Sequence, residues 1–210
     1  MKKILTLLIM ILFCIMLTQV IPGNQFTLET NASSIKKTTK KAKASYMRKI
    51  NKLSKNYKLP VFYKVVNIIG NKVPELMVIY EENNDVDEYL VVYTYKKGKI
   101  QRLLKTYFDN PYNDEYYSED YSGNTGYITL YKKTKTFVII TGSPGNEYFH
   151  YFKYFDGKFR LKAIANYSDG GDSYQNSHEK TIHRSRFRGI VRKLEKGKKT
   201  IYNYKNWARQ

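Results

Sequence analysis

Residues 148–159 read YFHYFKYFDGKF, an aromatic run that is interrupted by Asp156-Gly157 and then resumes. Asp-Gly between two such runs favours a tight β-hairpin, because both central positions of the preferred turn need positive φ. Residues 95–100, YKKGKI, match the second half of this stretch, and the two segments align on Gly98 and Gly157. Two hairpins that align in this way predict duplicated β units.

Similar runs continue on both sides of these hairpins. They are rich in Val, Ile, Tyr, Phe and Thr and are separated by clusters of Gly, Asn, Asp and Pro, which is typical of consecutive antiparallel strands. The expected strands are 61–69, 76–80, 89–95, 100–107, 127–131, 137–141, 148–155 and 159–167. The sequence therefore predicts a mainly β chain, with an antiparallel β domain at residues 59–175.

The N-terminal segment predicts export. Met1-Lys2-Lys3 precedes an apolar run, and Thr30-Asn31-Ala32 offers small residues before a cleavage point, so residues 1–32 are interpreted as a signal peptide. The predicted location is secreted or extracellular and cell-wall associated; the alternative is membrane anchoring by an uncleaved segment. Cleavage would remove Cys14, the one cysteine, and with it thiol catalysis and disulfides.

Two basic segments flank the expected β domain. Residues 33–43 carry five lysines and no acid, which predicts a flexible linker, and residues 44–58 have helical spacing of apolar side chains, which predicts an amphipathic helix. Residues 176–210 form a basic C-terminal segment. Within it, residues 184–196 favour a short helix, with a hairpin as the alternative.

The charge balance indicates anionic partners. Lys and Arg total 37 against 18 Asp and Glu, for a formal net charge of +19. For an exported protein this predicts binding to an anionic cell-wall polymer or a membrane surface, and no specific nucleic acid is expected. The predicted polyanion-binding residues are Lys49, Lys52, Lys55, Arg184, Arg186, Arg188, Arg192 and Trp207.

Ten of the 18 acidic residues fall in two expected loops, 81–88 and 109–120. The second loop also carries tyrosines that are suited to a glycan or protein partner. These candidate ligand-binding residues are Tyr112, Tyr116, Tyr117 and Tyr121. Two carboxylates held across a cleft could serve a hydrolase, so that function is the alternative, although no residue is assigned as catalytic.

Residues 66–76 read VNIIGNKVPEL, and Gly70 and Pro74-Glu75-Leu76 carry a resemblance. The stretch resembles a degenerate D-x-[DN]-G-D-G-x-P-E-L segment of the FG-GAP and VCBS-like repeats of secreted bacterial proteins. The resemblance implies β-propeller-like blades and a calcium loop. The chain is too short for the four or more blades of a closed propeller, so we expect consecutive hairpins in an open, incomplete arrangement.

The calcium ligands that the resemblance implies are mostly absent. The corresponding positions hold Asn67, Ile69 and Asn71, Lys72 replaces the turn glycine, and only Glu75 keeps a carboxylate. Calcium needs six to eight oxygen ligands, so we expect a structural turn without metal and no cofactor. His178 and His183 are five residues apart, which does not fit the helical spacing of a zinc site.

The sequence thus predicts a secreted, non-enzymatic, β-rich module that is held at the cell surface by its basic segments and acts in binding. The first alternative is an extracellular hydrolase using carboxylates of residues 81–88 and 109–120. The second is a structural subunit whose strands pair with those of a partner.

Overall fold

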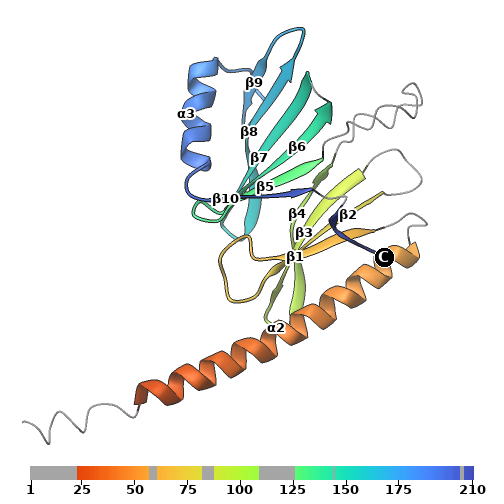
Figure 1. Ribbon diagram of the computed structural model, residues 1–210, viewed down its shortest axis with the longest axis vertical. Helices are drawn as coiled ribbons and strands as arrows, with labels where there is room; N and C mark the ends of the chain where they lie inside the picture. Colours follow the sequence, from red (N-terminus) through yellow and green to blue (C-terminus); the bar gives the residue numbers. More distant parts are fainter. Residues whose placement is uncertain (1–22, 57–60, 82–87, 109–125, 144, 204–205) are drawn as a thin grey trace, which may run out of the picture. The chain divides into compact units, whose positions relative to one another are not determined.

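The computed structural model describes residues 23–56, 61–81, 88–108, 126–143, 145–203 and 206–210 (Figure 1). It is mainly β, with antiparallel sheets built from hairpins, as the sequence predicts. The chain divides into two compact units, Met1–Lys40 and Lys41–Gln210. The second unit holds both sheets and the surfaces discussed below.

One sheet, sheet A, has the strand order β11-β1-β2-β3-β4. Its strands are β1 (Phe62–Val66), β2 (Glu75–Glu81), β3 (Glu88–Lys96), β4 (Lys99–Tyr107) and β11 (Ala208–Arg209). The other, sheet B, has the order β10-β5-β6-β7-β8-β9. Its strands are β5 (Tyr127–Tyr131), β6 (Thr136–Ser143), β7 (Asn146–Phe155), β8 (Lys158–Ser168), β9 (Ser173–Asn176) and β10 (Lys199–Asn203). Each sheet is a meander of consecutive strands with a C-terminal strand added beside its first strand. Among the described residues, neither closes into a barrel or propeller.

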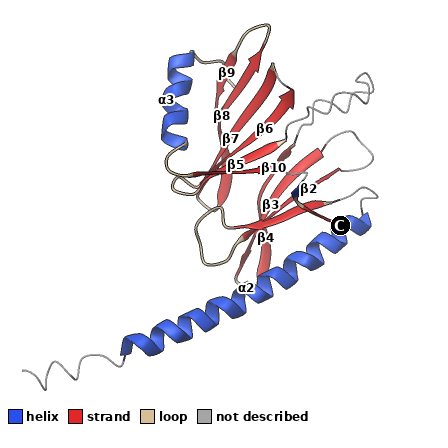
Figure 2. Ribbon diagram, viewed as in Figure 1, coloured by secondary structure: helices blue, strands red, loops and turns tan. Residues whose placement is uncertain are grey.

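The described residues also form two helices, α2 (Gly23–Asn56) and α3 (Arg184–Leu194) (Figure 2). Residues 33–43 lie inside α2, so they are helical rather than the flexible linker that was expected. Lysine and alanine favour helices, no Gly or Pro interrupts this segment, and the Thr38 hydroxyl donates to the Ser34 carbonyl at 2.9 Å. Neither helix, over the residues described, is long and apolar enough to cross a membrane.

Side chains from both faces of each sheet are buried, which gives three apolar layers. Tyr46 and Ile50 of α2 pack on the outer face of sheet A, with Leu76 and Tyr93 beneath them. The second layer lies between the sheets and includes Met77, Ile79, Leu90, Phe137, Ile139 and Phe152. The third places α3 against the outer face of sheet B. Within the second unit the order is therefore α2, sheet A, sheet B, α3.

The two hairpins that align in the sequence have the same turn conformation and the same position of a register shift. Lys97 and Gly98 connect β3 to β4 with φ of 51° and 79°, and Asp156 and Gly157 connect β7 to β8 with φ of 47° and 75°. Both hairpins have a register shift at the same place, between Val92 and Tyr93 and between Tyr151 and Phe152. Tyr93 and Phe152 each stand four residues before the first turn residue.

Candidate functional site: a basic helix face and a cleft between the sheets

α3 presents most of its positive charge to solvent. The helix begins after His183, whose Nδ1 accepts a hydrogen bond from the Ser185 amide at 3.3 Å. Phe187 and Leu194 are buried against sheet B, so the opposite face is exposed. The exposed residues of this basic helix face are Arg184, Arg186, Arg188, Arg192 and Lys193. Four of them are residues that the sequence predicted for polyanion binding.

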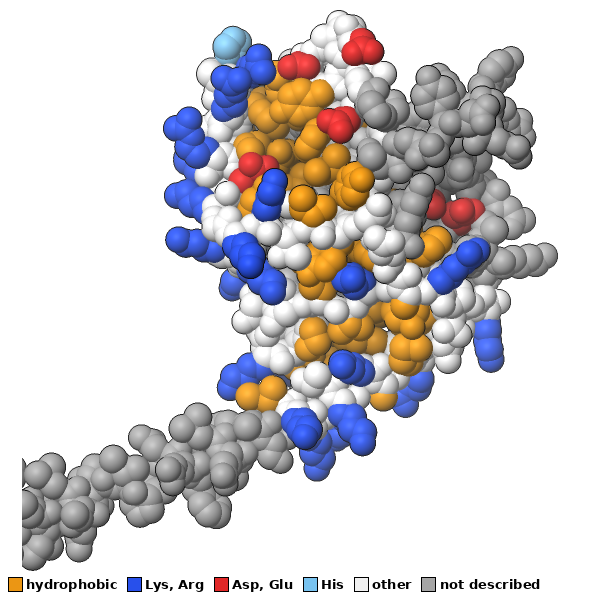
Figure 3. Space-filling model, viewed as in Figure 1, with side chains coloured by type: hydrophobic (Ala, Val, Ile, Leu, Met, Phe, Trp, Pro, Cys, Tyr) orange, Lys and Arg blue, Asp and Glu red, His pale blue; other side chains and the backbone are white. Residues whose placement is uncertain are grey.

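Two carboxylates lie close to the basic helix face: burial raises the pKa of Tyr167, the charges of Asp172 and Glu195 raise it further, and those of Arg184 and Arg188 lower it. No salt bridge between described residues involves α3; the pair formed by Arg160 and Asp156, at 3.9 Å, lies in the β7–β8 hairpin. Glu195, at the end of the helix, lies beside the Tyr131 hydroxyl; burial, and then this carboxylate, raise the pKa of Tyr131 to about 12. Figure 3 shows lysine and arginine side chains along the edge that α3 forms, at the left.

The predicted lysines of α2 differ among themselves. Lys52 and Lys55 are exposed, whereas Lys49 is half-buried and its Nζ lies 5.4 Å from the centroid of the Tyr93 ring. Burial lowers the pKa of Lys49, and the positive charges of Lys52 and Arg102 lower it further. Arg102, on β4, therefore adds to this positive region. Sequence reasoning missed it, because only the packing of α2 on sheet A brings it there.

Trp207, also predicted to bind a polyanion, is 6% exposed and belongs to the apolar layer between the sheets. The pairing of the adjacent β11 with β1 holds it there. Its Nε1 is buried and has no hydrogen-bond partner among the described residues. Trp207 therefore does not offer its ring to a surface ligand. Interleaving with basic residues in sequence could not reveal this, because the strand pairing is long-range.

Much of the predicted acidic and tyrosine-rich region lies outside the described residues. This applies to Tyr112, Tyr116, Tyr117 and Tyr121, to residues 109–120 as a whole and to residues 82–87. Glu81 and Glu88 are described, and they face each other across β2 and β3. Burial, and then the Glu81 charge, raise the pKa of Glu88 to about 7.

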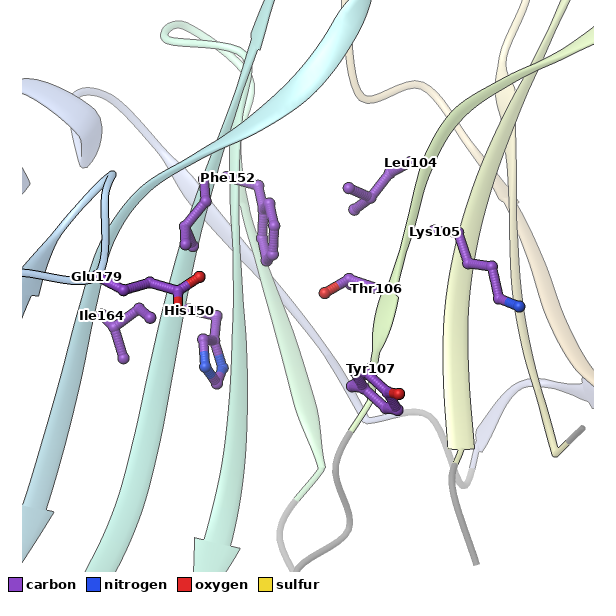
Figure 4. A pocket seen from close by; sticks show the side chains of 9 residues that line it. Leu104, Lys105, Thr106, Tyr107, His150, Phe152, Ile164 and Glu179 are labelled. Carbon is purple, nitrogen blue, oxygen red and sulfur yellow. The ribbon is translucent and has the colours of Figure 1, made fainter. Parts of the chain in front are cut away.

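A cavity of about 690 Å³, here called the cleft, lies between β4 of sheet A and β7–β8 of sheet B. Its apolar wall is formed by Leu104, Phe152, Leu161 and Ile164. Figure 4 shows the Thr106 hydroxyl and the Glu179 carboxylate directed toward the space, with His150 beside Ile164. An apolar wall with a few polar groups, in a volume of this size, is typical of small-ligand sites.

Other charged and aromatic groups shape one side of the cleft. The Lys105 side chain is directed away from it (Figure 4), and its Nζ lies 4.0 Å from the centroid of the Tyr89 ring. Tyr107 lies beside Tyr89 with ring centroids 4.9 Å apart and is 58% exposed. Although Tyr107 also lines the cleft, its ring lies against Tyr89, on the side of β4 to which Lys105 is directed.

Glu179 has an uncommon backbone conformation, with φ of 57°. The turn around it is held by Asn176, whose carbonyl accepts from the Glu179 amide at 3.0 Å and whose Oδ1 accepts from the His178 amide at 2.8 Å. Positive φ at a residue other than glycine costs free energy and often occurs at functional sites. The sequence analysis assigned no role to Glu179, because no sequence signal places it on the cleft.

The segment that resembles a calcium loop connects β1 to β2 and is held by side chains. Glu75 is 0% exposed, and its Oε2 accepts hydrogen bonds from the Ile68 and Ile69 amides at 2.8 and 3.3 Å. Asn67 Oδ1 accepts from the Gly70 amide at 2.7 Å. Burial raises the pKa of Glu75, although these hydrogen bonds oppose the shift. Its carboxylate thus organises the loop backbone. No group of three possible metal-ligating residues occurs in the described residues, and the absence of a metal stays a prediction.

No family model, no curated protein and no solved structure matches the chain. The basic helix face and the cleft are therefore interpreted from their own chemistry. The first can attract extended anions through charge. The second can bind a small polar group through Thr106, His150 and Glu179, with Phe152 and Leu104 supplying apolar surface.

Proposed function

We propose that the protein is a secreted, non-enzymatic binding module that its basic segments retain at an anionic cell-wall polymer or membrane surface. The observation that carries this proposal is the basic helix face, whose five positive side chains are exposed and have no salt bridge to a described residue. Their backbone is fixed, because Phe187 and Leu194 anchor the helix to sheet B. Positive charge on a rigid support attracts a polyanion at long range.

The positive region around Lys52, Lys55 and Arg102 supplies a second contact. It lies with α2 on the outer side of sheet A, whereas α3 lies on the outer side of sheet B. A long polymer can engage both regions, and the second contact is then favoured by the high effective concentration that the first creates. The protein would then bind the polymer more tightly than either region would bind it alone.

The cleft is the part of the module that we propose binds a second partner, a glycan or a peptide segment. It is lined by residues of both sheets, and Glu179 gives it a negative charge, whereas the basic helix face is positively charged. The tyrosines predicted for this ligand, Tyr112, Tyr116, Tyr117 and Tyr121, follow β4 in the sequence, and β4 forms one wall of the cleft.

We also propose that the two sheets are blade-like units in an open, incomplete arrangement, as the resemblance to FG-GAP and VCBS-like repeats implies. The alignment of the two hairpins, the shared turn conformation and the shared register shift support a duplicated unit. The calcium-like segment lies between the first two strands of sheet A, which is compatible with the role of a connecting loop in such a unit.

The test is sedimentation of the protein with purified cell walls, before and after removal of their anionic polymers, at low and high salt. We expect binding that is lost on stripping and that weakens at high salt, because screening shortens the range of the attraction. Replacing Arg184, Arg186, Arg188 and Arg192 by Glu should weaken binding by about tenfold or more.

A control variant carries the same charge change at exposed positions of the hairpin turns: Lys97, Lys99, Lys158 and Arg160, each replaced by Glu. This control should bind more tightly than the α3 variant. Equal loss in both variants would show that net charge alone determines binding and would contradict a role for the basic helix face. Binding that survives both stripping and high salt would contradict retention by charge.

The hydrolase alternative has one described feature in its favour. The Glu81–Glu88 pair contains a carboxyl whose pKa, about 7, suits proton transfer at neutral pH. If the protein released sugars or peptides from cell walls and Glu88→Gln removed this activity, the non-enzymatic proposal would be wrong. No release from any wall fraction would leave the pair without a catalytic role.

A further inference from the structure

A second cavity, of about 410 Å³, lies at the end of the sheets where several connections meet. It is formed by the β1–β2 loop, the end of β3, the β5–β6 turn and β7. Its lining includes three lysines, Lys72, Lys96 and Lys135, and no acidic residue. This lysine pocket therefore differs in charge from the cleft, which Glu179 lines. It is also separate from the basic helix face, because no residue of α3 lines it.

The lysines come from segments whose backbone is fixed. The loop that carries Lys72 is held by the buried Glu75 carboxylate, and the Tyr46 hydroxyl donates to the Pro74 carbonyl at 2.9 Å. Lys135 has φ of 53°, and its carbonyl accepts from the Tyr154 amide at 2.9 Å. A site with a fixed backbone loses less conformational entropy when it binds a ligand.

Three residues that carry hydroxyl groups also line the cavity, and they lie on different faces: Tyr95 packs in the layer beneath α2 and Tyr154 in the layer between the sheets. Thr94, Tyr95 and Tyr154 line the same cavity, and Thr94 is only 5% exposed. Lysine ammonium groups donate up to three hydrogen bonds, and hydroxyls donate one each. The lining thus combines positive charge with neutral donors, which suits a ligand that has several acceptor oxygens and negative charge.

The three lysines make no salt bridge to any residue that the structure describes. All three lysines are exposed, so water screens their mutual repulsion when the pocket is empty. An anion bound among them would accept hydrogen bonds that charge strengthens. We propose that the lysine pocket binds a tetrahedral oxyanion, a phosphate or phosphodiester group. This goes beyond the proposed function, since it assigns a discrete anion site to residues outside α2 and α3.

Residues of both sheets line the lysine pocket. Tyr95 and Tyr154 occupy equivalent positions of the two hairpins, each two residues before the first turn residue, and both line it. Lys72 and Lys96 come from sheet A and its first loop, whereas Lys135 comes from the β5–β6 turn of sheet B. Neither sheet alone supplies all three lysines of the lining.

The first experiment titrates the full protein with inorganic phosphate and then pyrophosphate at constant ionic strength, followed by amide NMR shifts. We expect saturable shifts at Gly70, Asn71 and Lys135, because these residues line the pocket. Replacing Lys72, Lys96 and Lys135 by Gln should weaken binding by about tenfold or more. Shifts that do not saturate would overturn the proposal.

The matched control replaces Lys97, Lys99 and Lys133 by Gln, which removes the same charge from neighbouring exposed positions that do not line the pocket. The control should keep the affinity of the unmodified protein. Equal weakening in both variants would show a general charge effect and would overturn a discrete site. Unchanged hydrogen exchange in the folded core would show that both variants are folded.

A second experiment distinguishes the source of the oxyanion. A poly(glycerol phosphate) oligomer and vesicles containing phosphatidylglycerol are each competed with pyrophosphate, with phosphatidylcholine vesicles as the reference. Competition by pyrophosphate that is lost in the Lys72, Lys96 and Lys135 variant would support the pocket, and the ligand that is displaced identifies the source of the oxyanion. If pyrophosphate displaces neither ligand, the pocket does not bind the phosphate groups of a polymer or a membrane. The α3 variant should keep pyrophosphate binding, so failure here and failure of wall retention are separable.

Discussion

The hairpins β3–β4 and β7–β8 agree in turn and register shift but differ in what their faces contact. Tyr93 and Phe152 are equivalent when the hairpins are aligned on Gly98 and Gly157. Tyr93 packs in the layer beneath α2, whereas Phe152 packs in the layer between the sheets. The next strands repeat the difference, since Ile100 lies on the α2 side and its equivalent Phe159 lies between the sheets.

This difference shows how the two sheets are stacked. Had a twofold axis related them, equivalent faces would meet, and Tyr93 and Phe152 would share one layer. Instead, one face of sheet A meets the opposite face of sheet B, which is a head-to-tail arrangement. Such a stack leaves one face uncovered at each end. α2 covers that of sheet A and α3 that of sheet B, as capping elements do in repeat proteins.

The largest effect is expected from a substitution in the apolar layer between the sheets, which tests whether the two sheets form one stack. Phe137 is 0% exposed, and its ring centroid lies 5.2 Å from that of Phe152 and 4.8 Å from that of Phe159. Phe137→Ala should lower the free energy of unfolding by about 3–5 kcal/mol, measured by chemical denaturation. Because both sheets share this layer, hydrogen exchange should accelerate in both.

The matched variant is Leu76→Ala. Leu76 faces Tyr93 in register as Phe137 faces Phe152, but it lies on the α2 side of sheet A. Its loss of stability should be about 2–5 kcal/mol, with the exchange increase greatest in residues 41–56 of α2. If Phe137→Ala accelerated exchange in sheet B alone, the sheets would not form one cooperative stack.

Local sequence signals predicted the strands and hairpins but not the stacking. Asp156-Gly157 indicates a tight turn and the aromatic runs beside it indicate strands, so the β meander could be predicted from short stretches of sequence. β10 and β11 pair with strands far away in the sequence, and Trp207 is buried for that reason. The cleft and the lysine pocket both need residues of two sheets, such as Thr106 with His150, and no local pattern reports such a meeting.

A second prediction uses Glu88 and Glu147, which are equivalent acidic residues in the same alignment of the two hairpins. Glu88 faces Glu81, whereas Glu147 faces Gly142. The pKa of Glu88 rises from 4.5 to about 7, so the folded chain holds this proton more tightly than the unfolded chain. Protonated Glu88 therefore contributes fully to the free energy of unfolding below pH 4.5, and this contribution is lost as the pH rises through about 7.

The size of this contribution is on the order of 3 kcal/mol. Denaturation measured across this pH range should show stability falling with pH in the unmodified protein. Glu88→Gln, which keeps a neutral side chain, should reduce that fall, and Glu147→Gln should keep it. A pH dependence that persists unchanged in Glu88→Gln would assign it to another group.

The smallest expected effect lies in the two turns, which have one conformation and different residues. Lys97 and Asp156 both have positive φ, 51° and 47°. Asp and Asn tolerate this region better than Lys does, so Lys97→Asn should stabilise the protein by about 0.5–1 kcal/mol, measured by chemical denaturation. Asp156→Lys should destabilise it by a similar amount; the 3.9 Å pair with Arg160 is exposed and adds little. Stabilisation by Lys97→Asn together with destabilisation by Asp156→Lys would show that side-chain preference for positive φ governs both turns. Destabilisation by both changes would contradict this and would mean that the Lys97 side chain makes a stabilising contact.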